Sequence, residues 1–162
     1  MQTYRWATLG CGVIANELAQ ALASRGQKLY SVANRTHAKA VAFAEKYGIE
    51  KVYDQIDDVF ADENVDIIYI STPHNTHIQY LRKALAAGKH VLCEKSITLN
   101  SDELEEAIRL AEAHHVVLAE AMTCLLYTSG LASFSASINS SNTPHTRPAS
   151  ALFIISKNSL IL

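Results

Sequence analysis

Cysteine is scarce in this chain of 162 residues, which contains only Cys11, Cys93 and Cys124. They form an odd set without C-x-x-C spacing, so the sequence indicates neither a disulfide framework nor a zinc site. An excess of either charge is lacking as well, because 14 basic and 16 acidic residues leave a formal net charge of -2. This balance offers no extended basic surface for nucleic acid or for an anionic membrane.

Long apolar runs are also missing. No segment approaches the ~20 apolar residues that a membrane span requires. The first residues do not form a basic region followed by an apolar run and a cleavage site, so we expect a cytoplasmic protein. The length and the apolar content of 49% allow one folded domain with one core.

Apolar periodicity alternates between that of a strand and that of a helix over most of the chain. Strands are predicted at 4–9, 28–33, 51–53, 66–70, 89–93 and 116–119, and helices at 13–24, 36–47, 75–87 and 101–115. Residues 54–64 are rich in turn formers and allow one short helix. The repeated order predicts an α/β fold, a doubly wound parallel sheet of Rossmann type.

The composition changes after Thr123. Glu120 is the last acidic residue, and serine becomes frequent beyond it. We therefore divide the chain into a dinucleotide-binding domain, 1–123, and a tail of low order, 124–162. The apolar segments near the end of the tail, 151–155 and 160–162, either pair as a strand or remain without regular structure.

A glycine-rich turn connects the first predicted strand to the first predicted helix. Gly10 can turn the chain sharply, Gly12 has no Cβ to block a diphosphate, and Ala15 is small enough for the helix to pack on the strand. With Val13 and Ile14, these residues predict a dinucleotide-binding loop at a helix N-terminus. The alternative is a tight strand-to-helix turn without a ligand.

The end of the second strand carries Asn34 and Arg35, at the distance from the glycines where this fold meets the adenosine ribose. A carboxylate at this place would bind both ribose hydroxyls and repel a 2'-phosphate, but no acidic residue lies between Glu17 and Glu45. Because Arg35 can pair with a phosphate through two hydrogen bonds, the sequence favours NADP, with NAD possible. The alternative is a solvated arginine at a helix start.

Polar residues follow the fourth of these buried strands: Ser71, Thr72, Pro73, His74 and His77. The carboxyl ends of parallel strands are where open sheets bind ligands, so we assign these residues to the cofactor. His74, or the asparagine after it, can instead cap the next helix. The two histidines are three apart, as in some metal sites, but no carboxylate or thiol nearby completes a metal site, and we predict none.

Glu94 and Lys95 end the next strand at the same edge of the sheet. A lysine beside a nicotinamide can donate a hydrogen bond to a substrate oxygen and stabilise the charge that develops as hydride moves. We therefore predict that Lys95 is catalytic and also contacts the cofactor, and that Glu94 faces the cofactor or orients it. The alternative is an exposed Glu-Lys pair at a strand end. Cys93 is expected to be buried and inert.

With these motifs in place, residues 3 to about 123 resemble the glucose-fructose oxidoreductase, inositol dehydrogenase and MocA family of NAD(P)-dependent oxidoreductases. The most specific likeness is the run AGKHVLCEK, which ends at Lys95. The resemblance implies that Lys95 contacts both the nicotinamide ribose and the substrate. Two positions depart from the family pattern: Ser96 stands where proline is usual, and His74 where asparagine is common.

The resemblance also implies what the chain does and lacks. Members of the family that the chain resembles are two-domain enzymes about twice this long. Their second domain carries the substrate pocket and usually a catalytic histidine and aspartate. We therefore expect a domain that binds the nicotinamide dinucleotide of an oxidoreductase acting on a sugar, polyol or related hydroxy or keto compound, inactive alone. A homo-oligomer is expected only with the second domain. The alternative is a non-catalytic sensor of the nucleotide.

The likeness to the family ends at Thr123. The next run, Cys124 to Ser129, resembles one reading frame of a transposon adapter used in preparing sequencing libraries. We therefore hypothesise that residues 124–162 are foreign or frameshifted. Resequencing the source gene tests this hypothesis, because it predicts an ordinary family continuation after Thr123.

Overall fold

A computed structural model describes residues 4–122 and 153–156 of the chain. Its contacts divide the chain into two compact units, Met1–Thr72 and Pro73–Leu162, which we describe one at a time. The predicted tail, 124–162, lies outside the described residues except for the strand β7 (Phe153–Ser156).

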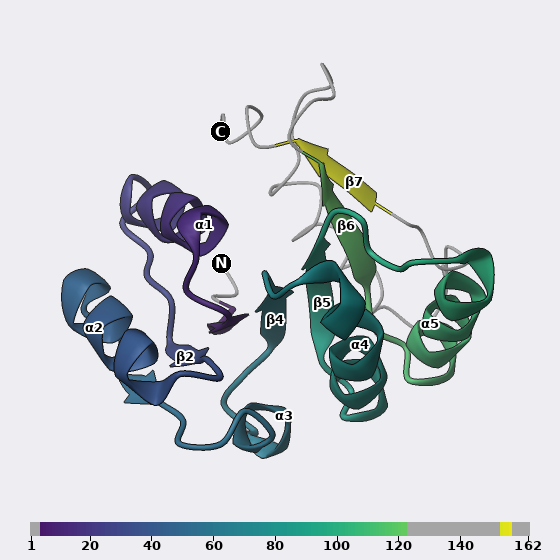
Figure 1. The fold of residues 1–162 in the computed structure, drawn as a ribbon, viewed down its shortest axis with the longest axis horizontal. Helices are drawn as coiled ribbons and strands as arrows, with labels where there is room; N and C mark the ends of the chain where they lie inside the picture. Colours follow the sequence, from purple (N-terminus) through teal and green to yellow (C-terminus); the bar gives the residue numbers. More distant parts are fainter. Residues whose placement is uncertain (1–3, 123–152, 157–162) are drawn as a thin grey trace. The chain divides into compact units, whose positions relative to one another are not determined.

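The first unit contains four strands and three helices (Figure 1). In chain order they are β1 (Trp6–Leu9), α1 (Val13–Ala23), β2 (Ser31–Ala33), α2 (His37–Tyr47), β3 (Lys51–Val52), α3 (Asp58–Ala61) and β4 (Ile67–Ile70). The strands lie in the order β3-β2-β1-β4 and every described pair is parallel. Because β1 is central, Thr8 pairs with Val32 on one side and with Tyr69 on the other.

Three strands form the buried centre of this unit. All residues of β1, β2 and β4 are buried, as expected for parallel strands covered on both faces. Helix α1 turns Ala15, Leu18, Ala19 and Leu22 into the core, and α2 packs on β2 and β3 through Ala40, Phe43 and Ala44.

One buried polar network lies beside this core. The Asp62 carboxylate, whose side chain is 5% exposed, accepts hydrogen bonds from Lys51 Nζ and the Tyr53 hydroxyl, both at 2.7 Å. Asn64 adds bonds from its backbone N–H at 2.9 Å and from its amide at 3.2 Å. The Tyr53 hydroxyl also lies 3.3 Å from Ser31 Oγ, so the network joins β2, β3 and the segment after α3.

The second unit contains the remaining elements. In chain order they are the 3-10 turn η1 (His74–Thr76), α4 (His77–Ala86), β5 (His90–Glu94), α5 (Ser101–Ala113), β6 (Leu118–Met122) and β7. Strands β5, β6 and β7 are paired in parallel in that order. Helices α4 and α5 lie side by side (Figure 1), and Arg82 joins them through two 2.7 Å hydrogen bonds to the carboxylate of Glu106.

The start of α4 differs from the prediction. A 3-10 turn precedes the helix, Thr76 is its N-cap, and neither His74 nor Asn75 caps it through a side chain. The reason is local: Pro73 begins the 3-10 turn, and the Thr76 hydroxyl donates to the Pro73 carbonyl at 2.6 Å. The cap prediction was therefore wrong, although a helix does follow.

The start of α5 carries a two-sided cap. Asn100 Oδ1 accepts a hydrogen bond from the Glu103 N–H at 2.9 Å, and the Glu103 carboxylate accepts one from the Leu99 N–H at 3.0 Å. We expect Asn100→Ala to lower the free energy of unfolding by about 1 kcal/mol, because one helix donor loses its partner. Urea denaturation followed by circular dichroism measures the change, and Asn100→Ser should recover most of it.

Candidate functional site

The glycine turn lies where three strands of the first unit end. The Gly10 N–H donates to the Ala33 carbonyl at 2.9 Å, which ties the turn to the end of β2. On the other side, a Cβ on Gly10 would lie 2.9 Å from the carbonyl oxygen of Ser71, after β4. Gly10 has φ +96°, a conformation that favours glycine. The structure therefore brings Gly10, Ala33 and Ser71 together.

The second glycine faces open space. A Cβ on Gly12 would meet no heavy atom within 4 Å, and Gly12 has an ordinary φ of -75°. The structure of the protein therefore gives no reason for glycine here, whereas a ligand close to the backbone would. Val13, the first residue of α1, is 74% exposed although it is apolar. Ile14 is half-buried and Ala15 fully buried, so α1 packs on the core from its third residue while its tip stays open.

The tip of α1 has the electrostatics of an anion site. Its first turn contains no acidic residue, and the first N–H groups of a helix lack partners within the helix. Cys11, in the loop before it, is partly buried. Burial raises the pKa of the Cys11 thiol, and the positive charge of Lys39 opposes that effect. Lys39 is therefore close enough to the loop to act on it electrostatically.

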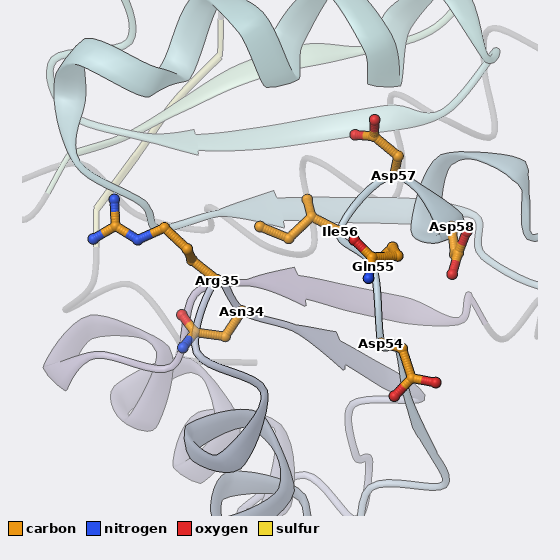
Figure 2. A pocket seen from close by; sticks show the side chains of 7 residues that line it. All are labelled: Asn34, Arg35, Asp54, Gln55, Ile56, Asp57 and Asp58. Carbon is orange, nitrogen blue, oxygen red and sulfur yellow. The ribbon is translucent and has the colours of Figure 1, made fainter.

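Asn34 and Arg35 line a hollow of about 510 Å³ at the end of β2. The opposite wall comes from the segment after β3 and the first residue of α3, and it includes Asp54, Asp57 and Asp58. Figure 2 shows the guanidinium of Arg35 pointing away from these three carboxylates. The hollow therefore has a cationic side and an acidic side.

The two predicted residues in this hollow behave differently. Asn34 Nδ2 donates to the carbonyl of Thr36 at 3.0 Å, so this amide also orders the turn into α2. Arg35 is exposed, and the structure gives it no hydrogen bond or ion pair with any described residue. Its guanidinium is therefore available to a ligand.

Sequence reasoning missed three features of this region. Lys39 was not predicted: it lies in the first turn of α2, and its charge acts on the Cys11 thiol of the glycine loop. The acidic wall was also overlooked, because it comes from a segment about 20 residues further on. The third is Asn16, which lies one turn into α1 and contacts the loop itself.

The remaining predicted residues of the first unit, Ser71 and Thr72, follow β4. Ser71 is tied to the end of β1, because both its N–H and its hydroxyl donate to the Leu9 carbonyl at 2.9 Å. Both residues are half-buried. They therefore lie at the edge of the sheet where the glycine turn also lies.

In the second unit, Pro73 and His74 are exposed while His77 is completely buried. The His77 Nδ1 lies 2.9 Å from the carbonyl oxygen of Ser96, so this histidine contacts the loop that contains Lys95. The two histidine rings meet edge to face with centroids 5.5 Å apart. Among residues 4–122, no group of three or more histidine, cysteine or acidic side chains is placed to hold a metal ion.

Strand β5 ends at Glu94, one residue beyond the predicted end of the strand, and Lys95 follows it; the surroundings of these two side chains differ. Glu94 is 7% exposed, whereas Lys95 is exposed and has no hydrogen bond or ion pair to another described residue. The peptide bond between Lys95 and Ser96 is cis. Cys93 is buried, as expected, and burial raises the pKa of its thiol well above the ordinary value, with Glu120 and Glu94 adding to the effect.

Comparison with known proteins identifies the fold. Residues 4–122 match the model of an oxidoreductase family described as having an NAD-binding Rossmann fold. The mouse trans-1,2-dihydrobenzene-1,2-diol dehydrogenase is 36% identical over 121 residues, which are 73% of this chain and 36% of that protein. The chain thus spans about a third of the length of this relative.

Solved structures agree with this fold. A 3-ketoreductase from Actinomadura kijaniata, in complex with TDP-benzene and NADP, is similar with a TM-score of 0.68 and 29% identity over 74% of this chain and 38% of that one. GenD2 from gentamicin A biosynthesis, in complex with NAD, has a TM-score of 0.69 and 26% identity over 74% and 34% of the two chains.

These matches confirm the predicted fold class and the predicted binding of a nicotinamide dinucleotide, NAD or NADP. None of the helices in the described parts of the chain has the length and apolar character to cross a membrane. The chain belongs to the glucose-fructose oxidoreductase, inositol dehydrogenase and MocA family, of which it contains the NAD-binding Rossmann domain.

Proposed function

We propose that this chain binds NADP(H) as the cofactor domain of an oxidoreductase that acts on a sugar, polyol or related hydroxy or keto compound. The observation that carries the proposal is the open tip of α1. Gly12 leaves room for a diphosphate, the helix N–H groups face that room, and no acidic residue repels the ligand. The exposed side chain of Val13 is the apolar surface that a bound dinucleotide would cover.

The preference for NADP over NAD is proposed from the cationic side of the hollow. Arg35 is exposed without a carboxylate partner among the described residues, and a second cation, Lys39, lies in the first turn of α2 that follows. A guanidinium can bind a phosphate through two charge-assisted hydrogen bonds. The acidic wall of the hollow favours NAD instead. NAD has no 2'-phosphate, and a carboxylate of this wall could accept hydrogen bonds from its free ribose hydroxyls.

Lys95 is the group that we propose for proton transfer. Its ammonium is exposed at the end of β5 and uses none of its donors on the described protein. Such a group can donate a hydrogen bond to a substrate oxygen and stabilise negative charge on it. The bound nicotinamide would supply or accept the hydride. The chain alone is expected to turn over little, because catalysis also requires a substrate held in near-attack geometry.

We expect Arg35→Ala to weaken NADPH binding about tenfold to thirtyfold while the dissociation constant of NADH changes less than twofold. The reason is the loss of charge-assisted hydrogen bonds to the 2'-phosphate, which NADH lacks. Titration of the 162-residue chain, followed by nicotinamide fluorescence and calorimetry, measures both constants.

Arg25→Ala is the matched control, because Arg25 follows α1 at its other end and should leave both constants unchanged. If the unmodified chain binds NADH more tightly than NADPH, the preference is overturned and the acidic wall becomes the ribose-binding side. If neither nucleotide binds to the folded chain at millimolar concentration, the whole proposal fails.

A further inference from the structure

Asn16 donates two hydrogen bonds to the glycine turn, and both go to the carbonyl oxygen of Gly12. Its backbone N–H donates to the Gly12 carbonyl at 3.1 Å, which is an ordinary helical bond. Its side-chain Nδ2 donates to the same carbonyl at 2.9 Å. The Gly12 oxygen therefore has both of its lone pairs occupied by a single residue.

The Asn16 amide is itself held from α2. Its Oδ1 accepts hydrogen bonds from the Tyr47 hydroxyl at 2.7 Å and from Lys46 Nζ at 2.8 Å. Since an ammonium only donates, the oxygen of the amide must face Lys46 and the NH₂ group must face Gly12. The last turn of α2 thus fixes which end of the amide reaches the glycine turn.

The hydrogen bonds from Asn16 to the Gly12 carbonyl also fix the direction of the Val13 N–H. In a trans peptide group the carbonyl and the N–H point in opposite directions, so holding the Gly12 carbonyl along α1 directs the Val13 N–H outward from the helix tip. Glycine permits many backbone conformations, so the peptide after Gly12 could otherwise rotate at little cost. Two hydrogen bonds from Asn16 oppose that rotation.

We propose that Asn16, held by Tyr47 and Lys46, is a positioning residue that keeps the Val13 N–H directed at the diphosphate of the bound dinucleotide. This inference rests on the proposed function. Asn16 touches no reacting atom: it acts by reducing the freedom that Gly12 introduces into the turn. A turn ordered before binding loses less conformational entropy when the ligand arrives.

The test removes the tyrosine hydroxyl, which belongs to another helix. Tyr47→Phe keeps the ring and its packing on Phe43, at 4.9 Å between centroids. We expect the dissociation constant of NADPH to rise about threefold to tenfold, the effect of one lost hydrogen bond. The affinity for 2'-AMP, which has the adenosine and 2'-phosphate but no diphosphate, should not change. Calorimetric titration of the full chain measures both.

Asn16→Ala is the second variant and completes a double-mutant cycle. It should weaken NADPH binding at least as much as Tyr47→Phe, and the double variant should lose no more than Asn16→Ala alone, because the hydroxyl acts only through the amide. Tyr53→Phe is the matched control: its hydroxyl belongs to the Asp62 network, so it should lower stability and leave NADPH affinity unchanged.

The outcomes distinguish failure of the proposed function from failure of the positioning role of Asn16. Failure of the unmodified chain to bind NADPH overturns the proposed function and this inference with it. Binding by the unmodified chain, with an unchanged constant in Tyr47→Phe or a parallel loss of 2'-AMP affinity, overturns only the positioning role. Additive losses in the double variant also overturn it, since they would show that the two side chains act separately.

Discussion

Gly10→Ala should lower the free energy of unfolding by about 2–4 kcal/mol. Two costs add here: the left-handed φ of +96° disfavours any Cβ, and overpacking strains the neighbours. The new Cβ would lie 2.9 Å from both the carbonyl oxygen and the hydroxyl of Ser71 and 3.2 Å from its carbonyl carbon. Backbone cannot move away as a flexible side chain can, and Ser71 is itself bonded to Leu9. Urea denaturation followed by circular dichroism measures the loss.

Gly12→Ala provides the matched comparison two residues away. Its Cβ would meet no atom of the described protein, and its φ is ordinary, so the unfolding free energy should change by less than about 0.5 kcal/mol. We nevertheless expect Gly12→Ala to lose most of its NADPH affinity, because the Cβ would occupy the space proposed for the diphosphate. Equal destabilisation by the two substitutions would contradict the geometry of the turn. Unchanged NADPH affinity in Gly12→Ala would contradict the proposed ligand position.

Asp62→Ala should cost about 2–4 kcal/mol of unfolding free energy, because the buried Tyr53 hydroxyl and the N–H of Asn64 lose their acceptor. Asp62→Asn should cost less, since one amide oxygen remains to accept a bond. Asp66 is the control: it accepts one bond, from the Arg5 N–H, and is only half-buried. Asp66→Ala should therefore have a smaller effect in the same denaturation experiment.

The Asp62 network also predicts how stability depends on pH. Burial alone would raise the pKa of Asp62, but hydrogen bonds from Lys51, Tyr53 and Asn64 outweigh it and hold this pKa well below its ordinary value of 3.8. Asp62 therefore binds a proton more readily in the unfolded chain than in the folded protein. Its contribution to stability is complete above the unfolded pKa and declines as the pH falls below about 4. Thermal unfolding from pH 7 to pH 2 should show this decline, and Asp62→Asn should make it shallower.

The elements were predictable because each has a strong local signal. The apolar run that became β4 is buried throughout, and Gly48, in a left-handed conformation, ends α2. Boundaries moved where side chains compete with the helix, as at Pro73, where a 3-10 turn replaced the predicted first turn. The second predicted strand also became shorter, from 28–33 to Ser31–Ala33.

The candidate site was predictable only in part. Gly10, Arg35 and Lys95 carry signals in their own neighbourhoods, such as a turn, a strand end or a familiar run of residues. Asn16 and the three aspartates of the hollow carry none, because their roles depend on partners that are distant in sequence. Asn16 meets Tyr47 across 31 residues, and no local pattern encodes such a distance.

The length of helix α2 fixes the distance between Arg35 and Tyr47. Arg35 precedes its first turn and Tyr47 belongs to its last, so its 11 residues set ~16 Å along the helix between the arginine proposed to bind the ligand and the tyrosine that holds Asn16. Each residue turns a helix by ~100°, so a single insertion or deletion within α2 would rotate Lys46 and Tyr47 away from Asn16. Variation in the length of this helix should therefore be tolerated far less than substitution along its exposed face.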